Sequence, residues 1–209
     1  MPSPRVIEDF EVVPLLTQMA LDKAGLIEAV RYAHAERKLC TANDANGFEA
    51  ITVYDKTARG LREIYGGGPW EKDESNGQAG IQHVGLRLRI VPCNFDEDCA
   101  SLRDPSNRSP KGEVSKAKAM CNATGWLFKR EEIAPQAGAE FLTWILGVRS
   151  VDGEPLRAEL SLPIKFDSNF YTGFAKRIIL LDGSEDDETA RRHEGPTPTE
   201  VVDIPIVRK

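Results

Sequence analysis

Two neighbouring apolar stretches, at 141–148 and 156–162, give the clearest structural signal in the chain. Residues 141–148 are almost all apolar, which is typical of a central strand covered on both faces. In residues 156–162 apolar side chains alternate with Arg157, Glu159 and Ser161, the period of a strand with one buried face. Asp152-Gly153 lies between the stretches and favours a tight turn. The sequence therefore predicts a β-hairpin from about Phe141 to Leu162, limited by Pro163.

The first third of the chain has apolar residues at helical spacing. Residues 11–39 carry such a face, with Pro14 tolerated in a first turn. Gly25 interrupts it, and Asp22 is a suitable cap for a second helix, so one kinked helix and two helices both fit. Residues 48–65 also have apolar side chains every three or four positions, which predicts a helix although 51–54 would favour a strand by propensity. Asn43 or Asn46 is expected to cap this helix, and the glycines at 66–68 to end it.

The middle of the chain alternates between polar and apolar stretches. Residues 70–80 read as a loop, and 82–91 as a half-exposed strand with Arg87 and Arg89 on one face. Pro92 is expected to end this strand or to place it at a sheet edge. The long polar segment 93–112 is expected to be functional or flexible, followed by a short helix at 113–124 that ends at Gly125. Residues 174–181 fit a last buried strand or the end of a helix.

These elements predict an α+β fold, with N-terminal helices packed on a mainly antiparallel β-sheet of about four to six strands. We expect a single domain over residues 1–182. Residues 183–209 form an acidic tail that we expect to be largely flexible, with a candidate edge strand at 201–207.

Composition and charge narrow the function classes. The net charge is −6 and the isoelectric point is near 5.2, so attraction of the whole surface for nucleic acid or anionic membrane is not expected. No stretch approaches the roughly 18 to 20 apolar residues that a membrane-spanning helix needs, and no apolar signal segment follows Met1. We therefore expect a cytoplasmic protein without membrane contact, with its four cysteines reduced.

A local basic face is the strongest binding signal. Arg87 and Arg89 share the predicted strand, and further cations follow in the long loop and the next helix. If the loop folds back over the strand, these side chains would form one patch for phosphate groups, and nucleic acid is a candidate partner. The alternative is an ordinary solvated face. The patch comprises Arg87, Arg89, Arg103, Arg108, Lys111 and Lys116, with Lys118 beside them.

Signals for catalysis are weaker. The histidines are His34, His83 and His193, and no GxSxG motif accompanies them. His83 with Asp96 and Asp98 could support metal-assisted phosphodiester chemistry, although the acidic run lacks EF-hand spacing. The hairpin carboxylates at 152 and 159 lack the lysine that a D…(E/D)xK nuclease needs. We expect no resident metal and no cofactor.

Three short segments carry a resemblance. They are Asn43-Asp44…Gly47-Phe48 before a helix that ends Leu61-Arg62-Glu63, then Ser109-Pro110-Lys111-Gly112, and Glu159-Leu160-Ser161-Leu162-Pro163 followed by Arg177-Ile178-Ile179-Leu180. Together they resemble a family of uncharacterised bacterial proteins of mobile or defence-type gene clusters. The resemblance implies no activity, but it favours an accessory or interaction subunit of a bacterial system.

The sequence thus favours a non-catalytic accessory subunit that works with a protein partner and contacts nucleic acid through the basic face. One alternative is the metal-assisted enzyme around His83. Another is a small-ligand sensor whose pocket lies between the helices and the sheet.

Overall fold

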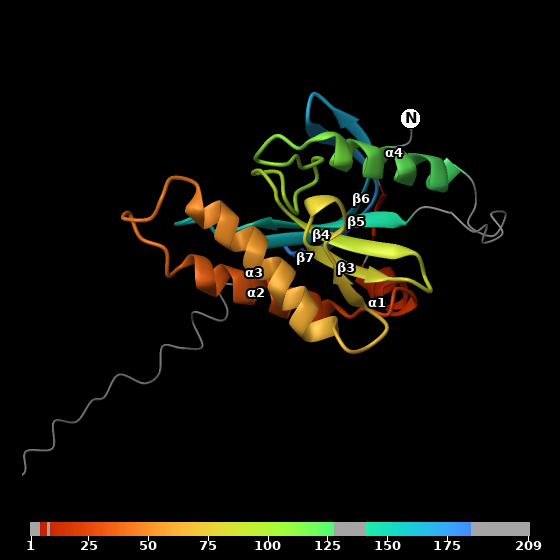
Figure 1. The fold of residues 1–209 in the computed structure, drawn as a ribbon, viewed down its shortest axis with the longest axis horizontal. Helices are drawn as coiled ribbons and strands as arrows, with labels where there is room; N and C mark the ends of the chain where they lie inside the picture. Colours follow the sequence, from red (N-terminus) through yellow and green to blue (C-terminus); the bar gives the residue numbers. More distant parts are fainter. Residues whose placement is uncertain (1–4, 8, 128–140, 185–209) are drawn as a thin grey trace, which may run out of the picture.

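One sheet organises the structure, a computed structural model that describes residues 5–7, 9–127 and 141–184 (Figure 1). Its seven strands follow the order β1-β7-β6-β5-β4-β3-β2. The β4–β5 and β1–β7 pairs are parallel and the other four are antiparallel, so the sheet is mainly antiparallel as predicted. The strands are β1 (Arg5–Val6), β2 (Glu71–Asp73), β3 (Gly80–His83), β4 (Leu88–Asn94), β5 (Leu142–Arg149), β6 (Arg157–Asp167) and β7 (Phe170–Leu181).

Helices cover both faces of this sheet (Figure 1). One face packs against α1 (Asp9–Gln18), α2 (Lys23–Arg37) and α3 (Phe48–Tyr65) through the larger apolar core. The other face packs against α4 (Glu113–Leu127) through a smaller core. On β5, Trp144 and Leu146 belong to the first core and Ile145 to the second, so this strand is covered on both faces as predicted. The fold is α+β.

The N-terminal helices follow the two-helix interpretation. Asp22 is the N-cap of α2, and its carboxylate accepts a hydrogen bond from the Gly25 amide at 2.7 Å. Because α1 begins at Asp9, Pro14 lies inside the helix and not in its first turn. The helix at 48–65 is confirmed, but its cap is Gly47 and not Asn43 or Asn46. Gly47 has a φ of 82°, a left-handed conformation that glycine adopts without steric cost.

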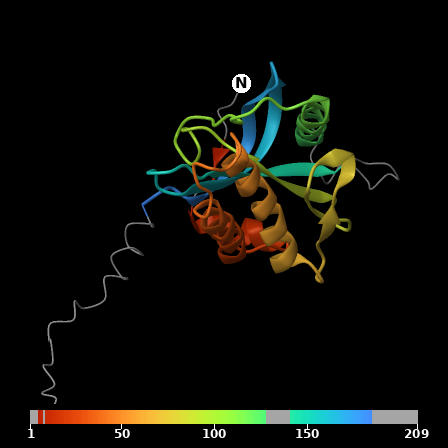
Figure 2. The same cartoon turned by 60° about the vertical axis from the view of Figure 1, so that its left-hand side comes forward.

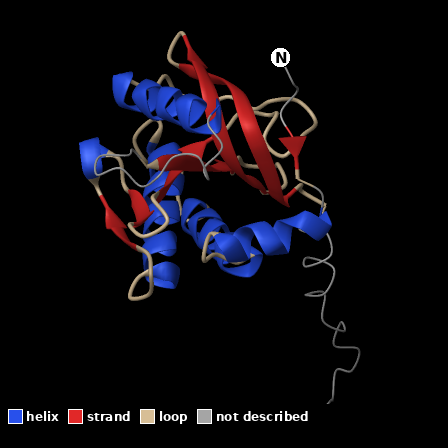
Figure 3. Ribbon diagram, turned by 90° about the vertical axis from the view of Figure 1, so that its right-hand side faces the viewer, coloured by secondary structure: helices blue, strands red, loops and turns tan. Residues whose placement is uncertain are grey.

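The hairpin is confirmed as β5 and β6, which pair in antiparallel fashion from Ile145–Ser161 to Arg149–Arg157. Pro163 does not end the second strand, because register shifts on both sides of it let β6 continue to Asp167 against β7. Figure 3 shows the long β6–β7 ribbon crossing the molecule beside α4. Residues 174–181 belong to this last strand, which settles that ambiguity in favour of a strand.

The segment 70–91 differs from its prediction. The expected loop contains β2, a short 3₁₀ helix at Ser75–Gly77 and the start of β3. The expected single strand is broken by a turn between His83 and Leu88, and Arg87 lies in that turn with a φ of 52°. Arg87 and Arg89 therefore do not share a strand face. Pro92 lies inside β4, but beyond Ile90, the last residue of β4 that pairs with β3, so the strand has one neighbour there.

The long connection between β4 and α4 is packed against the molecule (Figure 2). Its Phe95 and Cys99 are fully buried, and the Phe95 amide donates to the Val148 carbonyl at 2.9 Å. At Gly147 a Cβ atom would lie 2.1 Å from the Phe95 ring, so this position on β5 has room only for glycine. The helix that follows continues past Gly125 to Leu127, because a glycine inside a helix weakens it without ending it.

The acidic tail and its candidate edge strand at 201–207 lie outside the described residues. Among the described helices, none is long and apolar enough to cross a bilayer.

Candidate functional site

The predicted basic face is divided among several places. Arg89 and Lys111 line two neighbouring hollows on the side of the sheet that α4 covers, and Arg108 lines a third hollow near the start of α3. Arg103 lies on the surface beside Asp98, at 2.9 Å, and Lys116 lies beside Glu113, at 3.4 Å. The structure therefore places Arg89 and Lys118 in one hollow and Lys111 in the neighbouring one, and the other cations line neither of these two hollows.

The hollow that Arg89 and Lys118 line is called the outer hollow, and the one that Lys111 lines is called the inner hollow. The inner hollow lies beside the part of β4 that extends beyond the end of β3. β3 ends its pairing with β4 at Ile90, and β4 continues for four further residues without a strand on that side. Tyr54 of α3, Ser115 of α4 and the segment 76–78 border this gap. Gly80 permits the close approach of β3 at this point, since a Cβ there would lie 2.2 Å from the Ile90 carbonyl oxygen.

Gln78 stands between the two hollows. Its side-chain amide donates to Ser115 Oγ at 2.9 Å, and its carbonyl oxygen accepts from Lys118 Nζ at 2.6 Å. Ser115 lines the inner hollow and Lys118 the outer one. One side chain thus fixes the polar groups of both.

The inner hollow has a volume of about 290 Å³. The ammonium group of Lys111 lies 5.9 Å from the centre of the Tyr54 ring, and the Tyr54 hydroxyl accepts from the Ala79 amide at 3.0 Å. Burial raises the pKa of the Cys93 thiol to about 11, so this cysteine is protonated and chemically quiet at neutral pH. Tyr171 also lines this hollow, and burial raises the pKa of its hydroxyl.

The outer hollow is larger, about 490 Å³. Arg89 reaches it from β4, with its guanidinium 4.9 Å from the centre of the Phe141 ring and its Nε 2.5 Å from Asp73 Oδ2. Lys118 enters from α4 and forms no ion pair with any carboxylate that the structure describes. The remaining lining residues are Asn76, Glu113, Val114, Ala117 and Cys121.

The electrostatics of the outer hollow favour an anion. Burial, and then the nearby charge of Arg89, lower the pKa of Lys118 to about 8, while the charge of Asp73 acts in the opposite direction. Asp73 is paired with Arg89, and Glu113 with Lys116. Lys118 therefore has an unbalanced charge inside a partly apolar hollow, where an anionic ligand would interact with it more strongly than in water.

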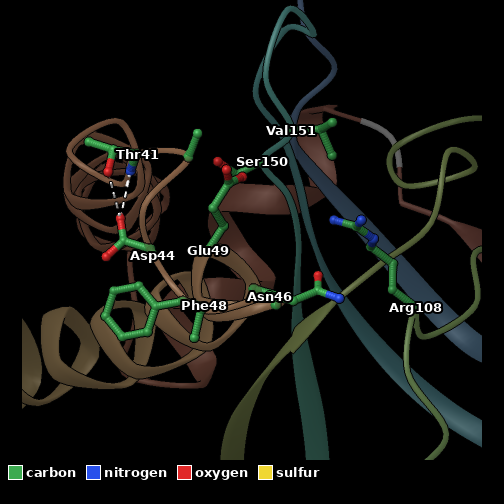
Figure 4. Close-up of a pocket in the computed structure, with 12 residues that line it drawn as sticks. Thr41, Asp44, Asn46, Phe48, Glu49, Arg108, Ser150 and Val151 are labelled. Carbon is green, nitrogen blue, oxygen red and sulfur yellow. Dashed lines mark hydrogen bonds between the residues drawn. The ribbon is translucent and has the colours of Figure 1, made fainter.

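The third hollow, of about 480 Å³, lies between the 41–50 segment, Arg108 and the β5–β6 turn (Figure 4). Arg108 approaches from the side opposite Asp44, whose carboxylate accepts from the Thr41 amide at 2.6 Å (Figure 4). Ser150 Oγ lies 2.8 Å from His34 Nδ1, and Glu49 pairs with Arg37 at 3.1 Å. The carboxylates of Asp44 and Glu49 line this hollow together with Arg108, so the hollow suits an anion less well.

The residues of the predicted metal-assisted site do not converge. His83 pairs with Leu88 at one end of β4, whereas Asp96 and Asp98 follow the other end, roughly 20 Å away for a strand of this length. His83 Nδ1 accepts from the Leu86 amide at 3.1 Å, and its ring contacts Trp70 edge to face. Asp98 pairs with Arg103. No group of three metal-ligating side chains occurs among the described residues.

Sequence reasoning found Arg89, Lys111 and Lys118 as cations but missed Gln78 and Asn76, because they lie in a segment interpreted as a loop. The segment that holds both residues is short and polar and has no apolar periodicity. Its position beside the two hollows therefore follows only from the fold. Comparison of the chain with protein-family models, with curated proteins and with solved structures found no match.

Proposed function

We propose that this protein binds a small anionic ligand that carries a phosphate group, in the outer hollow between β4 and α4. Lys118 carries the proposal: it lies beside Arg89 in a hollow, hydrogen bonds to Gln78, and has no carboxylate partner among the described residues. Phosphate oxygens would satisfy both cations, and the Phe141 ring offers an apolar wall. This corresponds to the ligand-sensor alternative from the sequence.

Two sources of the phosphate group are to be distinguished, a small phosphate ester and a nucleic-acid backbone. The volume of about 490 Å³ fits a small ligand. An extended nucleic acid would need several phosphate contacts along a surface. Arg103, Arg108 and Lys116 lie apart from the hollow, on the surface or beside the third hollow, so the geometry favours the small ester.

The test is calorimetric titration of the full chain with adenosine monophosphate and, separately, with a single-stranded oligonucleotide. We expect saturable binding of the mononucleotide that is weakened at least about tenfold by Lys118→Gln, since charged hydrogen bonds contribute about 1.5–3 kcal/mol. Lys38→Gln is the control for the lost charge, because Lys38 is exposed at the end of α2, on the other side of the sheet.

Two results would count against the proposal. Equal affinities of the Lys118→Gln and Lys38→Gln proteins would show that the hollow is not the site. Binding of the oligonucleotide alone, with a steep dependence on salt, would replace the small ester by a nucleic-acid backbone.

An accessory role beside a protein partner in a bacterial system stays a prediction of the sequence. It is checked by affinity purification of the tagged full chain from its host. A stoichiometric protein that co-purifies in repeated experiments would support the role, and recovery of the chain alone as a monomer would count against it.

A further inference from the structure

Lys118 combines three features. It lines the outer hollow, its amine donates a hydrogen bond to the Gln78 carbonyl oxygen at 2.6 Å, and a second cation, Arg89, lines the same hollow. Surface lysines usually point to water, where the ammonium is strongly hydrated and moves freely. The position of Lys118 instead favours a chemical role for its nitrogen.

We propose that Lys118 forms a reversible imine with the carbonyl carbon of an anionic aldehyde or ketone that Arg89 holds in the outer hollow. The inference rests on the proposed function and specifies the ligand class: a phosphate ester that also carries a carbonyl group. Arg89 would hold the anionic end, and Lys118 would meet the carbonyl end.

The step balances without an oxidant or a reductant. The neutral amine of Lys118 adds its lone pair to the carbonyl carbon, and a proton moves from nitrogen to the carbonyl oxygen. The carbinolamine then loses water, which forms the C=N bond. Hydrolysis by water reverses the step and releases the ligand unchanged. Gln78 accepts a hydrogen bond from the amine and so limits its orientation at the edge of the hollow.

The protonation state of Lys118 supports the step. Burial and the charge of Arg89 lower its pKa to about 8. About one Lys118 amine in ten is then neutral at pH 7, against about one in 2,500 for a lysine with the ordinary pKa of about 10.4. The same two causes, desolvation and a neighbouring cation, activate lysines that form Schiff bases.

The surroundings of the amine agree with a reversible adduct. Cys121 and Phe141 give the hollow an apolar wall. No described carboxylate forms an ion pair with the Lys118 ammonium, since Asp73 is paired with Arg89 and acts on Lys118 only through its charge. Lys116, on the same helix, has Glu113 at 3.4 Å and faces solvent. The two lysines therefore differ in environment while sharing a helix.

The experiment uses pyridoxal phosphate, which carries both an aldehyde and a phosphate ester, followed by reduction with borohydride. Peptide mass spectrometry of the full chain then measures the labelled fraction of each lysine. We expect Lys118 to be labelled at least about tenfold more than Lys116, given its larger neutral fraction. Excess adenosine monophosphate should suppress the label, and pyridoxal, which lacks the phosphate, should label Lys118 much less.

Binding of adenosine monophosphate to the wild-type protein separates this inference from the proposed function, because this nucleotide carries no carbonyl group and binds without an imine. The wild-type protein should bind it saturably and carry the label on Lys118, and Lys118→Arg should lose the label because a guanidinium forms no imine. Lys116→Arg should keep both the binding and the label. Labelling of Lys118 no stronger than that of Lys116, or equal labelling by pyridoxal and pyridoxal phosphate, would overturn the inference. Absence of adenosine monophosphate binding to the wild-type protein would overturn the proposed function itself, whereas binding without a label on Lys118 would overturn only the imine.

Discussion

At the scale of single residues, Glu159 shows how a side chain that resembles a catalytic group can serve the fold. It is fully buried, and its carboxylate accepts from Arg177 at 2.6 and 2.9 Å, from Ser161 Oγ and from the Ala100 amide. Arg177 in turn donates to the Arg103 carbonyl at 2.7 Å. The pair therefore fastens the long β4–α4 connection to β6 and β7. The charge of Glu159 was visible in the sequence, but its partner, eighteen residues away, was not.

Glu159→Gln should strongly destabilise the protein, because it leaves the buried Arg177 guanidinium without a counter-charge. We expect a loss of about 3–5 kcal/mol in the free energy of unfolding, measured by urea denaturation. Asp152→Asn is the control, since Asp152 is 96% exposed and its Arg37 contact is 3.7 Å long. That variant should change stability by less than about 1 kcal/mol. Similar stabilities of the two variants would contradict the anchoring role.

Two asparagines show that a sequence motif does not reveal whether a side chain is buried. Asn107 and Asn122 both match the Asn-x-Ser/Thr triplet, which says nothing about burial. Both side chains are almost fully buried, and both donate and accept hydrogen bonds. Asn107 donates to the Ser109 and Asn169 carbonyls and accepts from the Tyr171 amide. The contacts of Asn107 with Asn169 and Tyr171 join residues more than sixty positions apart, so no local pattern predicts them.

At the scale of elements, apolar patterns predicted α2, α3, β5 and the first half of β6. The two helices and β6 each repeat one apolar face, and β5 is a continuous apolar run. These patterns failed where tertiary contacts decide the boundary. The short β3 pairs with β4 on one side and with β2 on the other, and the turn that holds Arg87 interrupts the apolar alternation of residues 82–91. The sequence shows which residues are cations, but which of them lie together depends on where the strands end.

Asn122 of α4 forms a polar clamp, a set of hydrogen bonds that fastens this helix to β5 and β6. Asn122 donates to the Thr143 and Pro163 carbonyls, each at 2.8 Å, and accepts from the Thr143 amide at 2.8 Å. Asn122→Ala would leave these backbone groups unsatisfied, so we expect a loss of roughly 3 kcal/mol and faster hydrogen exchange at the Thr143 amide. Met120→Gln, at an exposed position of α4, should change both measurements little. Unchanged exchange in Asn122→Ala would show that the clamp does not hold α4.

At the scale of the whole molecule, ligand binding in the outer hollow is coupled to the stability of the fold. Its lining comes from β4, α4 and the segments around Asn76 and Phe141, which only the folded chain brings together. A ligand of this hollow binds the folded state alone and must raise the stability of the entire protein. The net charge of −6 opposes an incoming anion at long range, so the local cations must act at short range, inside the hollow.

The last prediction uses this linkage to test the charge on Lys118. At a concentration of adenosine monophosphate one hundred times its dissociation constant at pH 7, stability should rise by about 2.7 kcal/mol, or roughly 5–10 °C in Tm. Because the pKa of Lys118 in the free protein is lowered to about 8, the ammonium is present below that pH and is lost as the pH rises through it. The phosphate ester is already doubly charged above about pH 6, so it does not change in this range.

The affinity should therefore fall about tenfold between pH 7 and pH 9, which roughly halves the stabilisation at the same ligand concentration. The other charged or titratable groups that face Lys118 are Arg89 on β4, Asp73 on β2, and Glu113 and Cys121 on α4. Lys118→Arg leaves all of them in place and keeps its own charge at pH 9. Thermal melts of this variant should show a ligand shift that does not change with pH, and an equal decline in both proteins would assign the pH dependence to another group.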